Sequence, residues 1–482
     1  MGVRIGTLGL INRTFPGDMD GVHATFERDM REMAGEMGFE VLIAGKPFDR
    51  PADVEAWLGE LKGQGVDFLV VQLCAIPSGA VMEMIAKSGI PLGLWGLPEP
   101  AAEGPVQLNS LCGLTMFCSI IRTHLKGLPI RYKWFYGERQ DRRFAARFAA
   151  TVRSLKTVDR LKGARIGIVG GVAPGFLNVY ADRREIERRF GVQVAEYEFS
   201  DLRRIIEAAP VDAAIRRLAG KMAAEVDGVS DDVKGTLELN AVVHESLKKF
   251  AADNALDSLA VSCWPRFRTE LGIMPCAAYA RLTDNGLVTA CEGDLEGALG
   301  MRILQSLADS SPMIMDFTDV DRAAEMIQYW HCGNAPLGCG QPGTVRLAPH
   351  FKPGSRVTCG DSAKVGTTYD MRFAPGEYTV LRLMDDGSRC LLFTGEMMEN
   401  PRGKGFDGTR GWLGRLRFEG QALPLQDLLE TVMSVGIPHH HCLVRGDVAS
   451  ALTECMAWFG VEVIRPMPYG DSARFETAPQ RR

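Results

Sequence analysis

The chain contains few histidines, no closely spaced cysteine pairs and no long apolar run. It has 482 residues with only 8 histidines, and its 12 cysteines are scattered without a single CxxC spacing. In a chain of this length, scattered cysteines indicate reduced and mostly buried thiols rather than a disulfide framework or a zinc site.

Neither a membrane nor a nucleic acid is an expected partner. No stretch reaches 18 apolar residues, and the first residues lack the apolar core of a signal peptide. The net charge is −5, and the densest basic run, 142–153, alternates with Phe and Ala at helical spacing, as in a solvated helix face. We therefore expect a cytoplasmic protein.

The pattern of apolar segments predicts an α/β fold. A composition of 46% hydrophobic and 24% charged residues is typical of globular proteins, and the length suits about three domains. Short apolar segments alternate with helix-length segments from residue 3 onward, and the pattern restarts at Ala164. This alternation predicts two doubly wound, Rossmann-like parallel-sheet domains, 1–158 and 159–340.

A β-rich C-terminal domain, 341–482, is expected to follow. After a loop rich in Gly and Pro, short alternating segments predict strands of an antiparallel β-barrel or sandwich, and the barrel is our prediction. Helices are expected at 424–434 and 447–459. The predicted strands are 345–351, 355–361, 377–384, 389–397 and 411–418.

The stretch from Leu287 to Asp316 carries the strongest functional signal. The apolar run Leu287–Cys291 precedes the acids Glu292 and Asp294, and Asp294 stands at the N-cap position of a helix whose apolar residues recur every four positions. A second apolar run, 313–315, ends in Asp316. The pattern predicts strand, helix, strand, with a carboxylate at the carboxyl end of each strand, where open parallel sheets bind ligands.

Two carboxylates in this arrangement can hold one hard divalent cation. The alternative is that the acids only favour the helix N-terminus electrostatically. Three adjacent histidines, 439–441, offer a third ligand. Alternation along a strand predicts that His439 and His441 share one face and His440 the other, although a polar strand start without ligands fits equally well.

Three further features could belong to the site. His331 begins a glycine-rich loop and could reach the cation, or could simply cap a helix. Trp95 follows a predicted strand and could stack on a sugar, although core packing is the commoner role. The glycine turn 170–175 lies where nucleotide folds bind phosphates, but it is not GxGxxG, and a plain tight turn describes it better.

The segment 290–304, ACEGDLEGALGMRIL, resembles the part of the L-fucose and L-arabinose isomerases that contains their first metal-binding glutamate. Asp316 looks like the second acidic ligand of that family, with Asp319 as a competitor. The segment 438–440, PHH, resembles the place where a histidine completes the site. The likeness includes the order of the domains and so spans most of the chain.

The resemblance implies an aldose–ketose isomerase that acts on a pentose, a deoxyhexose or a related sugar through an enediol. Glu292, Asp316 and His440 would bind Mn²⁺, with Co²⁺ or Mg²⁺ as substitutes, and both acids would transfer protons. Trp95, His331 and His439 would contact the sugar. The family likeness also implies a homo-oligomer, hexamer or trimer, with sites at subunit interfaces.

Two other function classes fit parts of the sequence. The glycine turn 170–175 would suit an NAD-dependent oxidoreductase. Two α/β lobes also occur in sugar-binding proteins that have no catalytic activity, although the added β domain with its histidines argues against that class.

Overall fold

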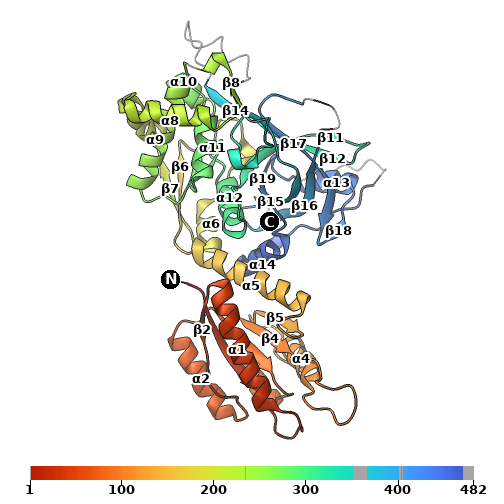
Figure 1. Cartoon of the computed structure of the whole chain (residues 1–482). Helices are drawn as coiled ribbons and strands as arrows, with labels where there is room; N and C mark the ends of the chain where they lie inside the picture. Colours follow the sequence, from red (N-terminus) through yellow and green to blue (C-terminus); the bar gives the residue numbers. More distant parts are fainter. Residues whose placement is uncertain (1, 234, 351–365, 401–402, 404, 471–482) are drawn as a thin grey trace. The chain divides into compact units, whose positions relative to one another are not determined.

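The computed structural model describes residues 2–233, 235–350, 366–400, 403 and 405–470. The chain divides into two compact units, Met1–Asp159 and Arg160–Arg482. Figure 1 shows the first in red to orange and the second in yellow to blue. Within the described residues, no helix is long and apolar enough to span a membrane.

Unit 1 contains a parallel sheet of five strands in the order β2-β1-β3-β4-β5. The central strand β3 is buried along its whole length, which explains why all of its residues except Gln72 are apolar. The strands are β1 (Arg4–Leu10), β2 (Glu40–Leu42), β3 (Phe68–Leu73), β4 (Leu92–Gly96) and β5 (Tyr132–Tyr136). The helices are α1 (Met19–Met37), α2 (Pro51–Gly63), α3 (Gly79–Ala86), α4 (Ser110–Ser119) and α5 (Arg142–Leu161), of which α5 continues into unit 2.

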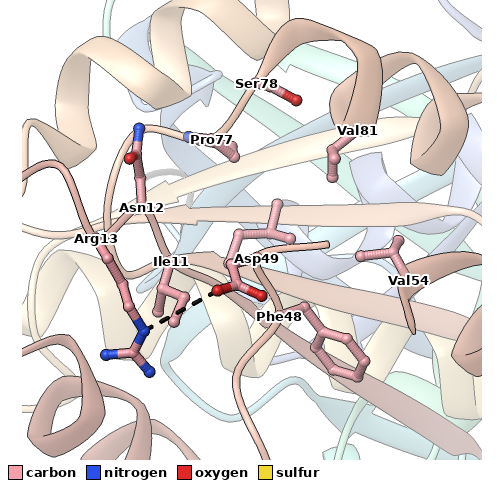
Figure 2. Close-up of a pocket in the computed structure, with 10 residues that line it drawn as sticks. Ile11, Asn12, Arg13, Phe48, Asp49, Val54, Pro77, Ser78 and Val81 are labelled. Carbon is pink, nitrogen blue, oxygen red and sulfur yellow. Dashed lines mark ion pairs between the residues drawn. The ribbon is translucent and has the colours of Figure 1, made fainter. Parts of the chain in front are cut away.

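A cavity of about 180 Å³ lies beyond the carboxyl end of β1 (Figure 2). Both apolar and polar side chains line it, and Ser78, the N-cap residue of α3, is among the polar ones. Arg13 lies at its edge and pairs with Asp49 at 4.0 Å and with Asp20 at 3.2 Å. The position is where open parallel sheets bind ligands, but the acids already balance the charge of Arg13.

Unit 2 begins with a second parallel sheet, in the order β10-β9-β6-β7. Its strands are β6 (Arg165–Val169), β7 (Gln193–Tyr197), β9 (Ser258–Val261) and β10 (Val288–Ala290). The helices of this part are α6 (Arg183–Phe190), α7 (Phe199–Ala208), α8 (Ala213–Ala224), α9 (Leu237–Asp253), α10 (Arg266–Leu271), α11 (Cys276–Asp284) and α12 (Leu295–Leu307). The predicted parallel sheets and the predicted helix after Asp294 are confirmed.

A large mixed sheet fills the rest of unit 2. Pairing runs from β16 through β15, β19, β11, β12 and β17, and β17 pairs with β16 again. These strands are β11 (Met313–Asp321), β12 (Met326–His331), β15 (Gly376–Met384), β16 (Arg389–Met398), β17 (Thr409–Phe418) and β19 (His440–Arg445). Around them lie β8 (Gly228–Val229), β13 (Arg346–Pro349), β14 (Thr367–Arg372), β18 (Gln421–Ala422), β20 (Glu462–Val463), α13 (Leu425–Val435) and α14 (Ala449–Phe459).

The position of β11 corrects the strand–helix–strand prediction. β10 lies in the parallel sheet, whereas β11 lies in the mixed sheet, antiparallel to β12 and β19. Asp316 is therefore inside a longer strand rather than at its carboxyl end. Local apolar spacing predicts a strand but not its neighbours, which are supplied here by residues far along the chain.

The β-rich part of the chain begins earlier than the sequence indicates, because β11 and β12 precede residue 341. The boundaries predicted near 158 and 340 for three domains stay a prediction. The predicted strand 355–361 lies outside the described residues.

Candidate metal centre

Glu292 is held by an unusual backbone immediately after β10. Its φ is 62°, in the left-handed region, and Gly293 follows with a φ of 73°. The backbone N–H of Ala173 donates to the carbonyl of Glu292 at 2.8 Å. A Cβ at Gly293 would lie 2.1 Å from the carbonyl oxygen of Gly171. The glycine turn 170–175 therefore fits closely against Glu292, and strain of this kind is concentrated at functional sites.

Asp316 and His440 are brought together by strand register. They are directly paired residues of the antiparallel strands β11 and β19, so their side chains project from the same face. Nε2 of His440 lies 3.6 Å from Oδ1 of Asp316 and 3.5 Å from Oε2 of Glu292. His440 thus lies between the two predicted acidic ligands, which come from two sheets. The closely grouped ligand atoms are those of Glu292, His439 and His440 and those of Asp316, His331 and His440.

The buried carboxylate of Asp294 sets the tautomer of His440. Oδ1 accepts the N–H of Gly297, as expected of an N-cap, and Oδ2 lies 3.0 Å from Nδ1 of His440. Burial opposes ionisation, yet Arg382 and His440 hold the pKa of Asp294 below its usual range. An ionised carboxylate can only accept, so Nδ1 of His440 carries the proton and Nε2 keeps its lone pair.

Arg382 contacts the same carboxylate oxygen of Asp294 as His440 does. Its guanidinium is fully buried on β15, and Nη1 lies 2.5 Å from Oδ2 of Asp294. Nη2 lies 3.6 Å from Glu296, whose Oε1 accepts the N–H of Gly387. Burial raises the pKa of Glu296 to about 7, so this second acid is largely protonated below neutral pH.

His331 lies beside the same centre, with the opposite tautomer. It ends β12 rather than beginning a loop, and is buried next to Asp316 and His440. Its Nδ1 accepts the backbone N–H of Cys332 at 2.8 Å. Burial disfavours a charged ring, but the neighbouring Cys332 and Asp316 raise the pKa of His331 to about 10. Nε2 carries a proton in the charged ring as well as in this neutral tautomer, and so suits hydrogen-bond donation rather than metal ligation.

The predicted alternation of the histidine run is wrong at its first residue. β19 begins at His440, so His439 precedes the strand and also approaches Glu292, with Nε2 at 3.7 Å from Oε2. His439 is about one-third exposed, stacks on Phe176 and contacts Asn178 at 3.0 Å. His441 points elsewhere, with Nδ1 2.8 Å from the hydroxyl of Tyr329, and burial lowers its pKa to about 3.

Trp95 belongs to the core of unit 1. It lies within β4 rather than beyond it, and only 1% of the residue is exposed. Its Nε1–H donates to the carbonyl of Gly137, and the ring packs against Phe144 with centroids 4.3 Å apart. No face of the indole is open to a sugar in this structure, and the core-packing alternative describes these contacts.

The geometry favours Asp316 over Asp319 as the second acidic ligand. A register shift separates Phe317 from Asp319, and Oδ1 of Asp319 accepts the N–H of Val320. Asp316, by contrast, groups with His331 and His440, their ligand atoms within 4.8 Å of one another. The roles of the ligands remain a prediction.

The residues fit a hard divalent cation. Nε2 of His440 and Oε2 of Glu292 are buried and have no hydrogen-bond partner within the described part of the chain. Two carboxylates and one imidazole with a free lone pair form a donor set suited to Mn²⁺, Co²⁺ or Mg²⁺.

Two of the network residues escaped the sequence reasoning. The local pattern indicates only a helix cap for Asp294, and it indicates no role for Arg382. A signal for Arg382 was available, because an arginine inside the apolar strand 377–384 must find a buried acidic partner.

Comparison with known proteins finds sulfoquinovose isomerases. The enzyme of Alkalicoccus urumqiensis is 27% identical over 418 residues, which are 86% of this chain and 89% of the relative. That of Priestia aryabhattai is 26% identical over 83% of this chain and 86% of its own, and that of Clostridium sp. (strain MSTE9) is 25% identical over 90% and 93%. This chain is an isomerase. Its class is that of the aldose–ketose intramolecular oxidoreductases.

The other comparisons add little. No family model matches the chain. A sugar ABC transport substrate-binding protein from Bordetella parapertussis 12822 is 14% identical over 60% of this chain and 74% of that one, with a TM-score of 0.17, which is too low to support an argument.

We predict that Gly293→Ala lowers both stability and turnover. The new Cβ would meet the carbonyl of Gly171, so Glu292 must shift, in addition to left-handed strain of about 1–2 kcal/mol. Gly191→Ala is the matched control, because its φ of 69° imposes the same strain but nothing lies within 4 Å of its Cβ. Urea unfolding measures the stability and steady-state kinetics measures the turnover. Equal losses in the two variants would contradict the role of the close contact between Gly293 and Gly171.

We predict that Asp294→Asn weakens cation binding by about 10–100-fold. An asparagine can still cap Gly297, but its NH₂ group would then face His440 and favour the tautomer with the proton on Nε2. Asp212→Asn is the control, because Asp212 only caps α8 and asparagine caps equally well. Calorimetric titration with Mn²⁺ measures the affinity, and unchanged binding in Asp294→Asn would refute the tautomer argument.

Proposed function

We propose that this chain is a metal-dependent isomerase of sulfoquinovose or a closely related sugar, with Glu292, Asp316 and His440 as ligands of Mn²⁺, or of Co²⁺ or Mg²⁺. The observation that carries the proposal is the position of Nε2 of His440, which faces Glu292 and Asp316 with the proton held on the far nitrogen by Asp294. That arrangement is what a metal-ligating imidazole requires.

The reaction moves a proton between C1 and C2 of the sugar through an enediol. When bound, the divalent cation supplies positive charge that stabilises the negative charge developing on the sugar oxygens. Glu292 and Asp316 can each bind with one carboxylate oxygen and leave the other to transfer the proton. Glu292 is buried and Asp316 about one-quarter exposed, so the two carboxylates approach the sugar from environments of different polarity.

The two remaining histidines suit different tasks. Nε2–H of His331 faces the centre from a buried position and would donate to a sugar oxygen without entering the metal coordination. His439, partly exposed and held by Phe176 and Asn178, would contact the sugar at the entrance.

The choice of substrate rests on the relatives, which are named as sulfoquinovose isomerases and match at least 83% of this chain. A homo-oligomer, hexamer or trimer, remains a proposal that rests on the family resemblance. The alternative of an NAD-dependent oxidoreductase depended on the glycine turn 170–175. That turn packs against the backbone of Glu292, so it no longer supports this alternative.

We predict that Glu292→Gln and Asp316→Asn each lower kcat by at least about 10³-fold, because each removes a ligand and a proton-transfer group together. The fold should persist, as judged by circular dichroism. Asp319→Asn is the control and should retain turnover, since Asp319 lies beyond the register shift. Exchange of the C2 proton in D₂O, followed by NMR with sulfoquinovose and with glucose, measures the activity. Full activity in both acid variants would remove the assignment.

We predict that prolonged chelation with EDTA abolishes turnover and that Mn²⁺ restores it. The physical reason is that the two carboxylates alone offer no positive charge to the developing enediolate. Activity is followed by ketose formation before chelation, after it and after reconstitution. An enzyme that keeps full activity while its metal content falls to zero would contradict the mechanism.

A further inference from the structure

A second group of potential metal ligands lies outside the proposed catalytic set. The thiols of Cys276 and Cys332 and the imidazole of His350 place their ligand atoms within 4.8 Å of one another. The three residues are at most 9% exposed. We propose that Cys276, Cys332 and His350 form a binding site for a thiophilic cation. The cation expected there is Zn²⁺.

The separation of the two sulfur atoms matches such a site. Sγ of Cys276 lies 3.6 Å from Sγ of Cys332. Two thiolates bound to one tetrahedral Zn²⁺ at about 2.3 Å are about 3.8 Å apart, so the cation requires almost no movement of either sulfur. A disulfide would need about 2.05 Å, and the two thiols are reduced in this structure.

The backbone brings the three residues together from separate elements. Cys276 is the first residue of α11, where the helix N-terminus favours a thiolate, and Cys332 directly follows β12. His350 follows β13, and its backbone N–H donates to the carbonyl of Gly366 at 3.4 Å. Gly366 packs so closely on Met274 that a Cβ would lie 2.6 Å from its backbone. This contact positions His350 near the start of α11.

The charges of the group also balance. Cation binding releases the protons of both thiols, and two thiolates with a neutral imidazole cancel the charge of a divalent ion. A buried unit of zero net charge avoids the desolvation penalty of an isolated ion. Sulfur and imidazole donors prefer Zn²⁺, whereas the carboxylates of Glu292 and Asp316 prefer harder cations, so the two sites are chemically distinct.

Local sequence patterns do not reveal this site, because zinc motifs are recognised by short spacings. Cys276 and Cys332 are 56 positions apart, and no CxxC occurs. The site also adjoins the proposed catalytic centre, since Sγ of Cys332 lies 3.2 Å from Nδ1 of His331.

The test uses the full-length, reduced protein, freed of metal and then saturated with Mg²⁺ to occupy the oxygen-rich centre. Titration with Co²⁺, a spectroscopic substitute for Zn²⁺, should produce a near-ultraviolet thiolate-to-cobalt band that saturates at one ion per chain and disappears when Zn²⁺ is added. Cys276→Ser and Cys332→Ser should each weaken binding by more than about 100-fold, since even partners outside the ligand shell contribute 10–100-fold.

Three comparisons make the outcome decisive. Cys390→Ser, which removes a buried thiol from β16, should keep the band, and so should His440→Ala, which removes only the proposed catalytic ligand. His350→Gln keeps both thiols and should still weaken binding, so it carries the test if a cysteine variant does not fold. The proposal is overturned if the wild type shows no thiolate band, if the band survives in Cys276→Ser, or if protein purified without air contains a Cys276–Cys332 disulfide by mass spectrometry.

Discussion

The hydrogen bond between the buried carboxylate of Asp294 and Nδ1 of His440 is the constraint on which the rest of the site depends. A carboxylate in this position would be protonated by burial alone, and the fully buried guanidinium of Arg382 prevents that. A charge that is paired at the core thus determines which nitrogen of His440 faces Glu292 and Asp316. Removal of one partner would leave another charge buried and unpaired, so each of the three groups depends on the other two.

The same network joins the two sheets of unit 2. Asp294 begins α12, which follows the parallel sheet, whereas Arg382 and His440 lie on neighbouring strands of the mixed sheet. Polar side chains therefore connect the layers at the point where ligands converge. The backbone of Glu292 is held separately, by Ala173 and by the close approach of Gly293 to Gly171. Position and protonation of the site are set by different contacts.

Much of this arrangement could be predicted from local patterns. The alternation of apolar and helical segments predicted the parallel sheets, and the spacing after Asp294 predicted α12 with its cap. Acids after short apolar runs pointed to Glu292 and Asp316, which the structure brings close to His440. The signals for α12, Glu292 and Asp316 are each contained within a few consecutive residues, and the roles of the two acids stay a prediction.

The failures concern partners that are distant in sequence. No spacing around 313–315 shows that β11 pairs with β19, and none shows that His439 lies outside that strand. Arg382 and Asp294 are 88 positions apart, and their pairing appears only in three dimensions. The position of Trp95 after a predicted strand suggested a contact with the sugar, yet its ring is enclosed by aromatic neighbours in unit 1.

The pairing of Asp316 with His440 has a consequence for biosynthesis. Because the imidazole is contributed by β19, a nascent chain can complete the parallel sheet and α12 well before the ribosome has added it. Until then β15 and β11 each lack the strand that lies between them. The candidate metal centre is accordingly completed late, and a prematurely terminated chain that ends before β19 would lack His440 and be prone to associate through two exposed strand edges.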